Sequence, residues 1–143
     1  MRNTRACPAA VFSWPVRVYY EDTDLGGVVY YANYLRFLER ARTEWLRALG
    51  FEQTALAADH RVVFVVRSIS LDYLKPARFD DVLEITVEPA GIGASRVELS
   101  QRVRRGTEDL VAARVELTCV NTATFKPVRI PRSVAERLIR HAP

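Results

Sequence analysis

Residues 18–45, VYYEDTDLGGVVYYANYLRFLERARTEW, place an acidic, glycine-containing turn directly before a long amphipathic segment. Asn33 is a favoured residue at a helix N-cap, and Gly50 is a favoured residue just past a helix C-terminus. Between them, apolar residues recur at three- or four-residue spacing, as on one buried helix face. The spacing predicts a helix over residues 33–50. Its apolar stripe consists of Tyr34, Leu38, Ala41, Trp45 and Leu49.

The rest of the chain reads mainly as strands. Strict alternation of apolar and polar residues indicates strands with one dry and one wet face, which favours antiparallel pairing. We expect strands over residues 14–20, 61–74, 82–88, 94–104 and 110–120, a short helix over 52–58 and a last helix after Pro131. One dry sheet face must cover one long helix, so the predicted fold class is α+β, with an antiparallel sheet wrapped around a central helix.

Length and composition are those of an ordinary globular protein. With 143 residues, of which 49% are hydrophobic, we expect one domain over residues 1–143, with a core at about 14–131 and a basic C-terminal tail or helix. The absence of an apolar run near 20 residues speaks against membrane insertion, and MRNTRACPAAVFSW does not resemble a signal peptide. Cys7 and Cys119 suggest no disulfide framework, which favours the cytoplasm. The net charge of +4 is concentrated at the two ends, which does not favour nucleic-acid binding.

Most catalytic motifs are missing. There is no G-x-S-x-G, and the two histidines, His60 and His141, cannot supply a serine triad or a metal cluster. Asp22-x-Asp24 does not open an EF-hand, because the twelfth position of that loop is Asn33. Carboxylate chemistry remains, with an acid before a helix N-terminus suited to acyl hydrolysis. From the residues alone, Asp24 is more readily explained as a turn residue, so both interpretations stay open.

A longer pattern resembles a known family. The run at residues 18–46, together with VVRS at 65–68, YLKPARFDD at 73–81 and Lys126-Pro127, resembles the hotdog-fold acyl-CoA thioesterases of the 4-hydroxybenzoyl-CoA thioesterase superfamily. Within it, the sequence is most similar to the branch associated with the Tol-Pal cell-envelope system. The similarity covers residues 14–131 and implies a hotdog fold, in which a sheet wraps a long helix.

The resemblance also implies an activity and a site. The activity would be hydrolysis of an acyl-CoA thioester to a free acid and CoA, without metal or organic cofactor. Asp24 would act as general base or nucleophile, the backbone N–H of Tyr31 would polarise the carbonyl, and Tyr20 would shape the pocket. The site would lie between subunits of a homodimer or homotetramer. The Tol-Pal branch usually has His where this chain has Tyr31.

Two further residues are candidates for binding the CoA phosphates. Arg67 interrupts an apolar strand face and therefore needs a partner, which could be phosphate or an acid of the loop. Ser95 lies at a glycine-rich turn. Two other functions remain open: a module that binds acyl-CoA or an acyl carrier protein without turnover, and a dehydratase. The dehydratase is disfavoured because His60 is the sole internal histidine.

Overall fold

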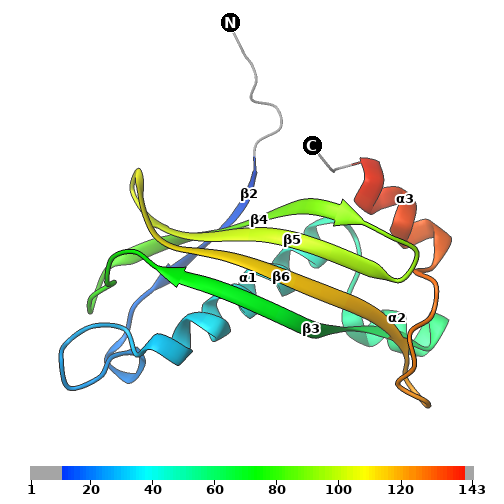
Figure 1. The fold of residues 1–143 in the computed structure, drawn as a ribbon, viewed down its shortest axis with the longest axis horizontal. Coiled ribbons are helices and arrows are strands. Elements are labelled where there is room, and N and C mark those ends of the chain that lie inside the picture. Colours follow the sequence, from blue (N-terminus) through cyan, green and yellow to red (C-terminus); the bar gives the residue numbers. More distant parts are fainter. Residues whose placement is uncertain (1–10, 141–143) are drawn as a thin grey trace, which may run out of the picture.

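A computed structural model describes residues 11–140, in which a five-stranded antiparallel sheet curves around one long helix (Figure 1). The strands lie in the order β2-β4-β5-β6-β3. In chain order the elements are β2 (Phe12–Arg17), α1 (Tyr34–Ala48), α2 (Gln53–His60), β3 (Val62–Tyr73), β4 (Val82–Ile92), β5 (Arg96–Arg105), β6 (Glu108–Asn121) and α3 (Arg132–Arg140), with 3-10 turns at Tyr20–Asp22 and Tyr31–Asn33. Cys7 and His141, considered above, lie outside the described residues.

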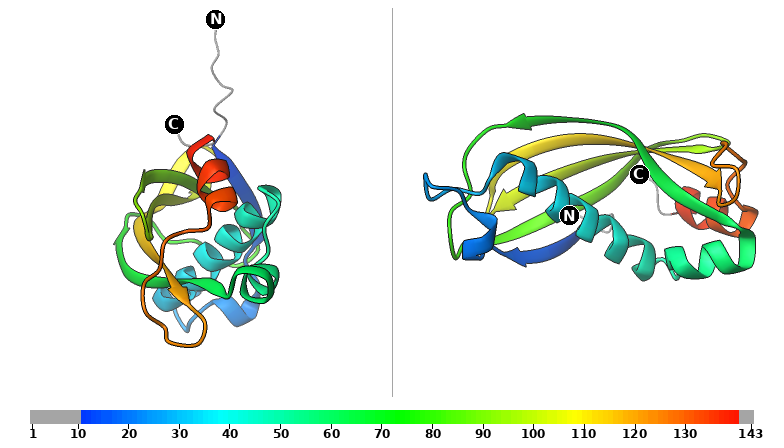
Figure 2. Two further views of the ribbon diagram at one scale, coloured as in Figure 1. Left: turned by 90° about the vertical axis from the view of Figure 1, so that its right-hand side faces the viewer. Right: turned by 90° about the horizontal axis from the view of Figure 1, so that it is seen from below.

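The predicted α+β layout is confirmed. Seen along its length, the sheet curls around α1, which lies against its concave face (Figure 2). Each predicted helix and strand is present, with shifted ends. β2 ends at Arg17 because the chain turns at residues 20–22, and β4 extends to Ile92 through an irregularity between Pro89 and Gly91.

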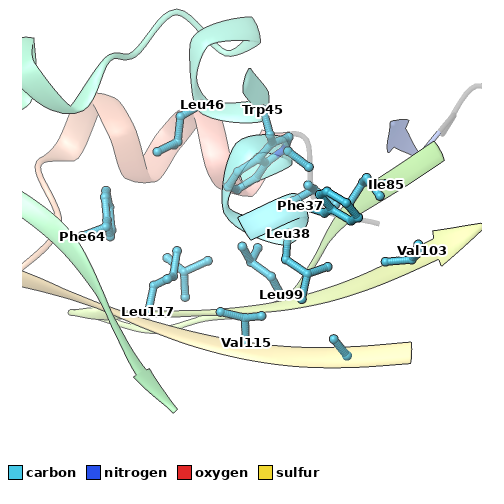
Figure 3. Close-up of a cluster of buried hydrophobic side chains, with 14 of the residues drawn as sticks. Phe37, Leu38, Trp45, Leu46, Phe64, Ile85, Leu99, Val103, Val115 and Leu117 are labelled. Carbon is cyan, nitrogen blue, oxygen red and sulfur yellow. The ribbon is translucent and has the colours of Figure 1, made fainter. Parts of the chain in front are cut away.

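The core lies between α1 and the concave face of the sheet (Figure 3). Phe37 and Leu38 of α1 are fully buried, and they face apolar side chains from alternate positions of the strands. The alternation predicted for the strands is therefore correct. The inward strand residues include Leu83, Ile85, Val87, Val97, Leu99, Val103, Val115 and Leu117.

One polar side chain interrupts this apolar face. Gln101 of β5 is fully buried, and its amide donates to the carbonyl oxygens of Leu38 and Thr86, both at 3.2 Å. Its own oxygen accepts a hydrogen bond from Arg42 at 3.0 Å. Because each polar group of the amide is paired, burial of Gln101 avoids the cost of an unsatisfied donor or acceptor. The contact ties the middle of α1 to the sheet.

The C-terminal end of α1 is capped by α3. Arg137 donates a hydrogen bond to the Leu49 carbonyl and lies 5.8 Å from the ring centre of Phe51. A cation at this end of a helix satisfies an unpaired carbonyl and opposes the helix dipole. Gly50 follows with a φ of +96°, as predicted for the residue past the helix end. Within residues 11–140 no helix is long and apolar enough to cross a membrane.

The loop between β3 and β4 is held by a chain of ion pairs. Lys75 contacts Glu108 at 2.7 Å, and Arg105 contacts both Glu108 at 2.9 Å and Asp81 at 2.7 Å. The hydrogen bond from Lys75, which has the larger effect, and the hydrogen bond from Arg105 hold the pKa of Glu108 below its ordinary value of 4.5. A depressed carboxyl pKa stabilises the folded state above the unfolded pKa, and this stability disappears as the pH falls through the folded pKa.

We therefore expect Glu108→Gln to lower the melting temperature slightly at pH 7, with a difference from the parent that shrinks as the pH falls below the ordinary carboxyl pKa of 4.5 and through the lower folded pKa. Thermal denaturation of the variant and the parent between pH 7 and pH 3 measures this difference in melting temperature. Glu88→Gln is the control, because Glu88 makes no ion pair within residues 11–140. A difference that stays constant across the titration would contradict the assignment of this stability to the Glu108 carboxylate.

Candidate active site

The acidic residues lie on a tight hairpin that projects beside the start of α1 (Figure 2). Thr23 pairs with Val29, and the N–H of Asp24 donates to the Val28 carbonyl at 2.9 Å. The turn closes at Gly27, whose φ of +79° is a conformation that glycine adopts without strain. The hairpin thereby holds Asp24 at a defined position near the helix start.

The Asp24 side chain is exposed in the single chain. Its Oδ1 accepts a hydrogen bond from the N–H of Gly26 at 2.8 Å. A Cβ at position 26 would lie 3.2 Å from that oxygen, so glycine allows this close approach. Within residues 11–140, Oδ2 accepts no hydrogen bond and Asp24 forms no ion pair. One carboxylate oxygen is therefore available for chemistry.

Asp22 has a different role from Asp24. It is only 6% exposed, and its carboxylate accepts hydrogen bonds from the N–H of Tyr19 and from Nδ2 of Asn33, both at 2.8 Å. Its carbonyl accepts from the N–H of Tyr30 at 2.9 Å. Asp22 therefore joins the hairpin to the start of α1.

Asn33 occupies the N-cap position of α1, as predicted, but its side chain does not cap the helix. Asn33 has a helical φ of −71°, and its side chain makes no capping hydrogen bond. Its Nδ2 donates to the buried Asp22 carboxylate at 2.8 Å, which ties the N-cap residue to the hairpin.

The N–H of Tyr31 is free at the beginning of the helical segment. The N–H of Asn33 donates to the Tyr30 carbonyl at 2.8 Å, whereas in the described part of the chain the N–H of Tyr31 has no protein acceptor. The first N–H groups of a helix lack intrahelical partners and carry the positive end of its dipole. This backbone donor can bind a carbonyl oxygen on which negative charge develops.

Next to this donor is a small aromatic cleft of about 260 Å³. Tyr34 forms part of its wall, and its hydroxyl accepts a hydrogen bond from the N–H of Ala77 at 3.1 Å. Burial raises the pKa of Tyr34, so the side chain is neutral near pH 7. The cleft suits an apolar group beside the Tyr31 N–H. Its lining residues are Val29, Tyr31, Tyr34, Tyr73, Leu74, Lys75 and Pro76.

The structure does not bring Tyr20 into this cleft. The Tyr20 ring is exposed and stacks on Phe79 with ring centres 4.0 Å apart. Both rings line a separate cleft of about 520 Å³ with Arg17 and Asp80. Asp24 lines neither of these two clefts. Tyr20 is therefore near Asp24 in sequence, but its ring belongs to another surface.

Arg67 lies at an irregularity in β3, where the pairing with β6 shifts between Val66 and Ser68. Its guanidinium is 3.6 Å from Glu116, which also binds Arg96 at 2.6 Å. The loop acids are thus not its partners. Because two guanidinium groups share one carboxylate, this part of the sheet surface has a net positive charge.

Ser95 lies in the turn between β4 and β5, at the opposite end of the sheet from the acidic hairpin (Figure 1). Its carbonyl accepts a hydrogen bond from the N–H of Cys119 at 2.8 Å. Cys119 is fully buried, as predicted for a small core residue, and burial raises the pKa of its thiol. Ser95 and Asp24 are therefore not brought together within one chain.

The described residues offer no obvious metal site. Within residues 11–140, no group of three or more His, Cys, Asp and Glu side chains is arranged to hold a metal ion. His60 is exposed at the end of α2.

Sequence reasoning missed two of the contacts that organise the site. The Asp22–Asn33 hydrogen bond spans 11 residues, and the Tyr73–Tyr31 hydrogen bond spans 42. The spacing of Asp22 and Asn33 within one acidic and aromatic run was a weak signal for the first. Nothing local marks the second, because Tyr73 has the pattern of an ordinary strand end.

A curved antiparallel sheet wrapped around one long helix is the architecture of the hotdog fold. Residues 18–138 match the family model of the thioesterase-like superfamily, and the chain belongs to this family. This confirms the predicted hotdog fold.

Similar proteins support the same assignment. Over 123 residues the chain is 46% identical to "Acyl-CoA thioesterase YbgC" of Haemophilus influenzae, covering 86% of this chain and 90% of that protein. It is 48% identical over 125 residues to "Acyl-CoA thioester hydrolase YbgC" of Escherichia coli O157:H7, covering 87% and 92%. A probable thioesterase from Bartonella henselae has a similar structure, with a TM-score of 0.81 and 38% identity, covering 85% of this chain and all of that one.

Proposed function

We propose that this protein hydrolyses acyl-CoA thioesters to a free acid and CoA. The observation that carries the proposal is the exposed Asp24 carboxylate, with one oxygen free, on a hairpin joined by Asp22 to a helix start whose Tyr31 N–H has no protein acceptor within residues 11–140. Thioester hydrolysis needs these two parts, a base or nucleophile and a donor for the developing oxyanion. The names of the two YbgC relatives support the same reaction.

Asp24 can act in either of two ways, as a general base or as a nucleophile. As general base it takes a proton from water while the oxygen attacks the carbonyl carbon. The tetrahedral oxyanion binds the Tyr31 N–H, the C–S bond breaks, and the proton passes to the CoA thiolate. As nucleophile, its oxygen attacks the carbonyl carbon and expels CoA thiolate. Water then attacks the mixed anhydride, which releases the free acid and regenerates the Asp24 carboxylate, and the proton that water gives up passes to the thiolate. The Tyr31 N–H serves both routes.

For CoA binding, the geometry favours Arg67 over Ser95. The Arg67 guanidinium is largely exposed and shares its carboxylate with Arg96, so phosphate can bind without first breaking a close ion pair. Ser95 lies in the turn between β4 and β5, at the sheet end remote from the acidic hairpin (Figure 1). Tyr20, stacked on Phe79, remains a proposed contact for the outer part of the substrate.

The two edge strands of the sheet differ, and the difference favours a homodimer formed through β3. β2 and β3 are the edge strands, and β2 contains Pro15, which lacks an N–H for pairing with a further strand. β3 has 12 residues, contains no proline and exposes Val66. An edge strand of this length leaves unpaired N–H and C=O groups that can pair with a second copy. We infer that the partner covers the hairpin and that the site lies between subunits.

Val66→Lys is expected to convert the oligomer to monomer, because it places a charge on the open edge. Sedimentation velocity measures the change. Val82→Lys is the matched control, because Val82 is 48% exposed, against 47% for Val66, but lies outside β3. An unchanged sedimentation coefficient for Val66→Lys, or equal dissociation of both variants, would contradict pairing through β3.

The activity is tested by incubating the protein with a panel of aliphatic and aromatic acyl-CoAs and measuring free thiol. We expect thiol release well above the buffer rate for at least one class of acyl group. The alternative function, a non-catalytic hotdog module, predicts acyl-CoA binding without thiol release. A thioester-loaded acyl carrier protein in the same assay tests whether a carrier protein replaces CoA as the donor.

Three further proposals rest on the sequence alone. They are membership of the Tol-Pal-associated branch, a cytoplasmic location and a single domain over residues 1–143. Tyr31 in place of the usual His of that branch suggests that its backbone N–H, rather than the side chain, is used.

A further inference from the structure

A hydrogen bond from a distant strand lies directly behind the Tyr31 N–H. The hydroxyl of Tyr73 donates to the carbonyl oxygen of Tyr31 at 3.0 Å. Tyr73 is the last residue of β3, and its neighbours in space are the first residues of the helical segment. The contact therefore connects the edge strand of the sheet to the start of α1.

The Tyr73 side chain is held in a defined orientation. Its backbone pairs with Val111 of β6, so the strand fixes its Cα. Its ring centre lies 5.7 Å from that of Tyr34, with the planes tilted by 55°, and 6.4 Å from that of Tyr31, edge to face at 83°. Aromatic contacts of this geometry are favourable and restrict rotation of the ring. The hydroxyl thus points consistently at the Tyr31 carbonyl.

Two hydrogen bonds restrain the backbone on either side of the free donor. The N–H of Tyr30 is held by the Asp22 carbonyl, and the carbonyl of Tyr31 is held by Tyr73. The N–H of Tyr31 lies in the same peptide plane as the Tyr30 carbonyl, which accepts from the N–H of Asn33 at 2.8 Å, and the Tyr31 carbonyl lies in the next plane. Because the two planes meet at the Tyr31 Cα, a hydrogen bond on each of them limits rotation there and so restrains the direction of the N–H. Preorganised donors stabilise an oxyanion better than mobile ones, because they need no reorganisation during the reaction.

We propose that Tyr73 is a positioning residue that aims the Tyr31 N–H at the thioester carbonyl. The inference rests on the proposed hydrolysis, since it assigns a role within the same site. Tyr73 need not touch the reacting atoms. Its effect passes through the Tyr31 backbone, so it acts on the transition state more than on substrate binding.

The test is Tyr73→Phe, which removes the hydroxyl and keeps the ring. We expect kcat to fall about tenfold, the scale of one hydrogen bond, while KM changes less than about twofold. Affinity is measured separately with a thioether analogue of the substrate, in which a CH2 group replaces the carbonyl. Because this analogue has no oxygen for the Tyr31 N–H, its affinity should stay within about twofold of the parent value.

Two further variants make the test specific. Ser13→Ala is the control, because it also removes a hydroxyl that donates one hydrogen bond, to Glu84 at 2.9 Å, but Ser13 lies on β2 and lines none of the clefts described above, so we expect parent kcat. Tyr73→Leu removes the ring as well, and we expect the same loss of kcat with a higher KM. Each variant is assayed below its own melting temperature.

Unchanged kcat in Tyr73→Phe, with thiol release by the parent protein, would overturn the positioning role and leave the proposed function standing. Equal losses of kcat and of analogue affinity would also overturn it, because they would indicate a damaged cleft. A loss of kcat in Tyr73→Leu but not in Tyr73→Phe would assign the effect to the ring. Absence of thiol release by the parent would instead contradict the proposed function itself.

Discussion

Asp24→Asn is expected to lower kcat by about 10²–10⁴-fold, the usual size of a general-base contribution, and by more if Asp24 is the nucleophile. The amide can neither accept a proton from water nor attack a thioester. Folding should be unaffected, because Asp24 is exposed and the oxygen of Asn can still accept the hydrogen bond from Gly26. Free-thiol release at saturating acyl-CoA measures the loss.

Glu21→Gln is the control for this experiment. Glu21 is an exposed acid three residues away on the same acidic run, so its substitution removes the same charge from the same region. We expect kcat within about threefold of the parent enzyme, since the effect of one exposed charge is small in water. Full activity in Asp24→Asn, or equal losses in both variants, would show that the Asp24 carboxylate does not do the chemistry.

Asp22→Ala is expected to destabilise the fold by about 2–4 kcal/mol, because the buried carboxylate accepts two hydrogen bonds. Without it, the amide of Asn33 loses its acceptor in a buried place, and the N–H of Tyr19 loses its acceptor in a partly buried one. The hairpin is then no longer tied to the start of α1, so kcat should also fall. Urea denaturation measures the stability, and thiol release measures the activity.

A double-mutant cycle separates this contact from general damage to the hairpin. Asn33→Ala removes one of the two donors. The double variant Asp22→Ala/Asn33→Ala should therefore lose less unfolding free energy than the sum of the losses in the two single variants. Asp59→Ala, an exposed acid on α2, should leave stability within about 0.5 kcal/mol. Strict additivity of the two single effects would indicate that Asp22 and Asn33 are not coupled.

Local patterns in the sequence were sufficient to predict the architecture. The stripe from Tyr34 to Leu49 predicted α1, and the alternation around Leu83 and Leu99 predicted which strand residues face the core. These patterns are reliable because a helix or strand repeats at a fixed period, and one face of it must be buried. The acidic run before α1 likewise marked the region of the candidate site.

The sequence alone therefore determined the α+β fold, the order of its elements and the place of the acidic hairpin. The tertiary structure decided which carboxylate is buried, since Asp22 meets Tyr19 and Asn33 while Asp24 stays exposed. It also decided that Gln101 is paired in the core and that Tyr73 reaches Tyr31. Side chains far apart along the chain meet only when the sheet closes around the helix, and no local period encodes such pairings.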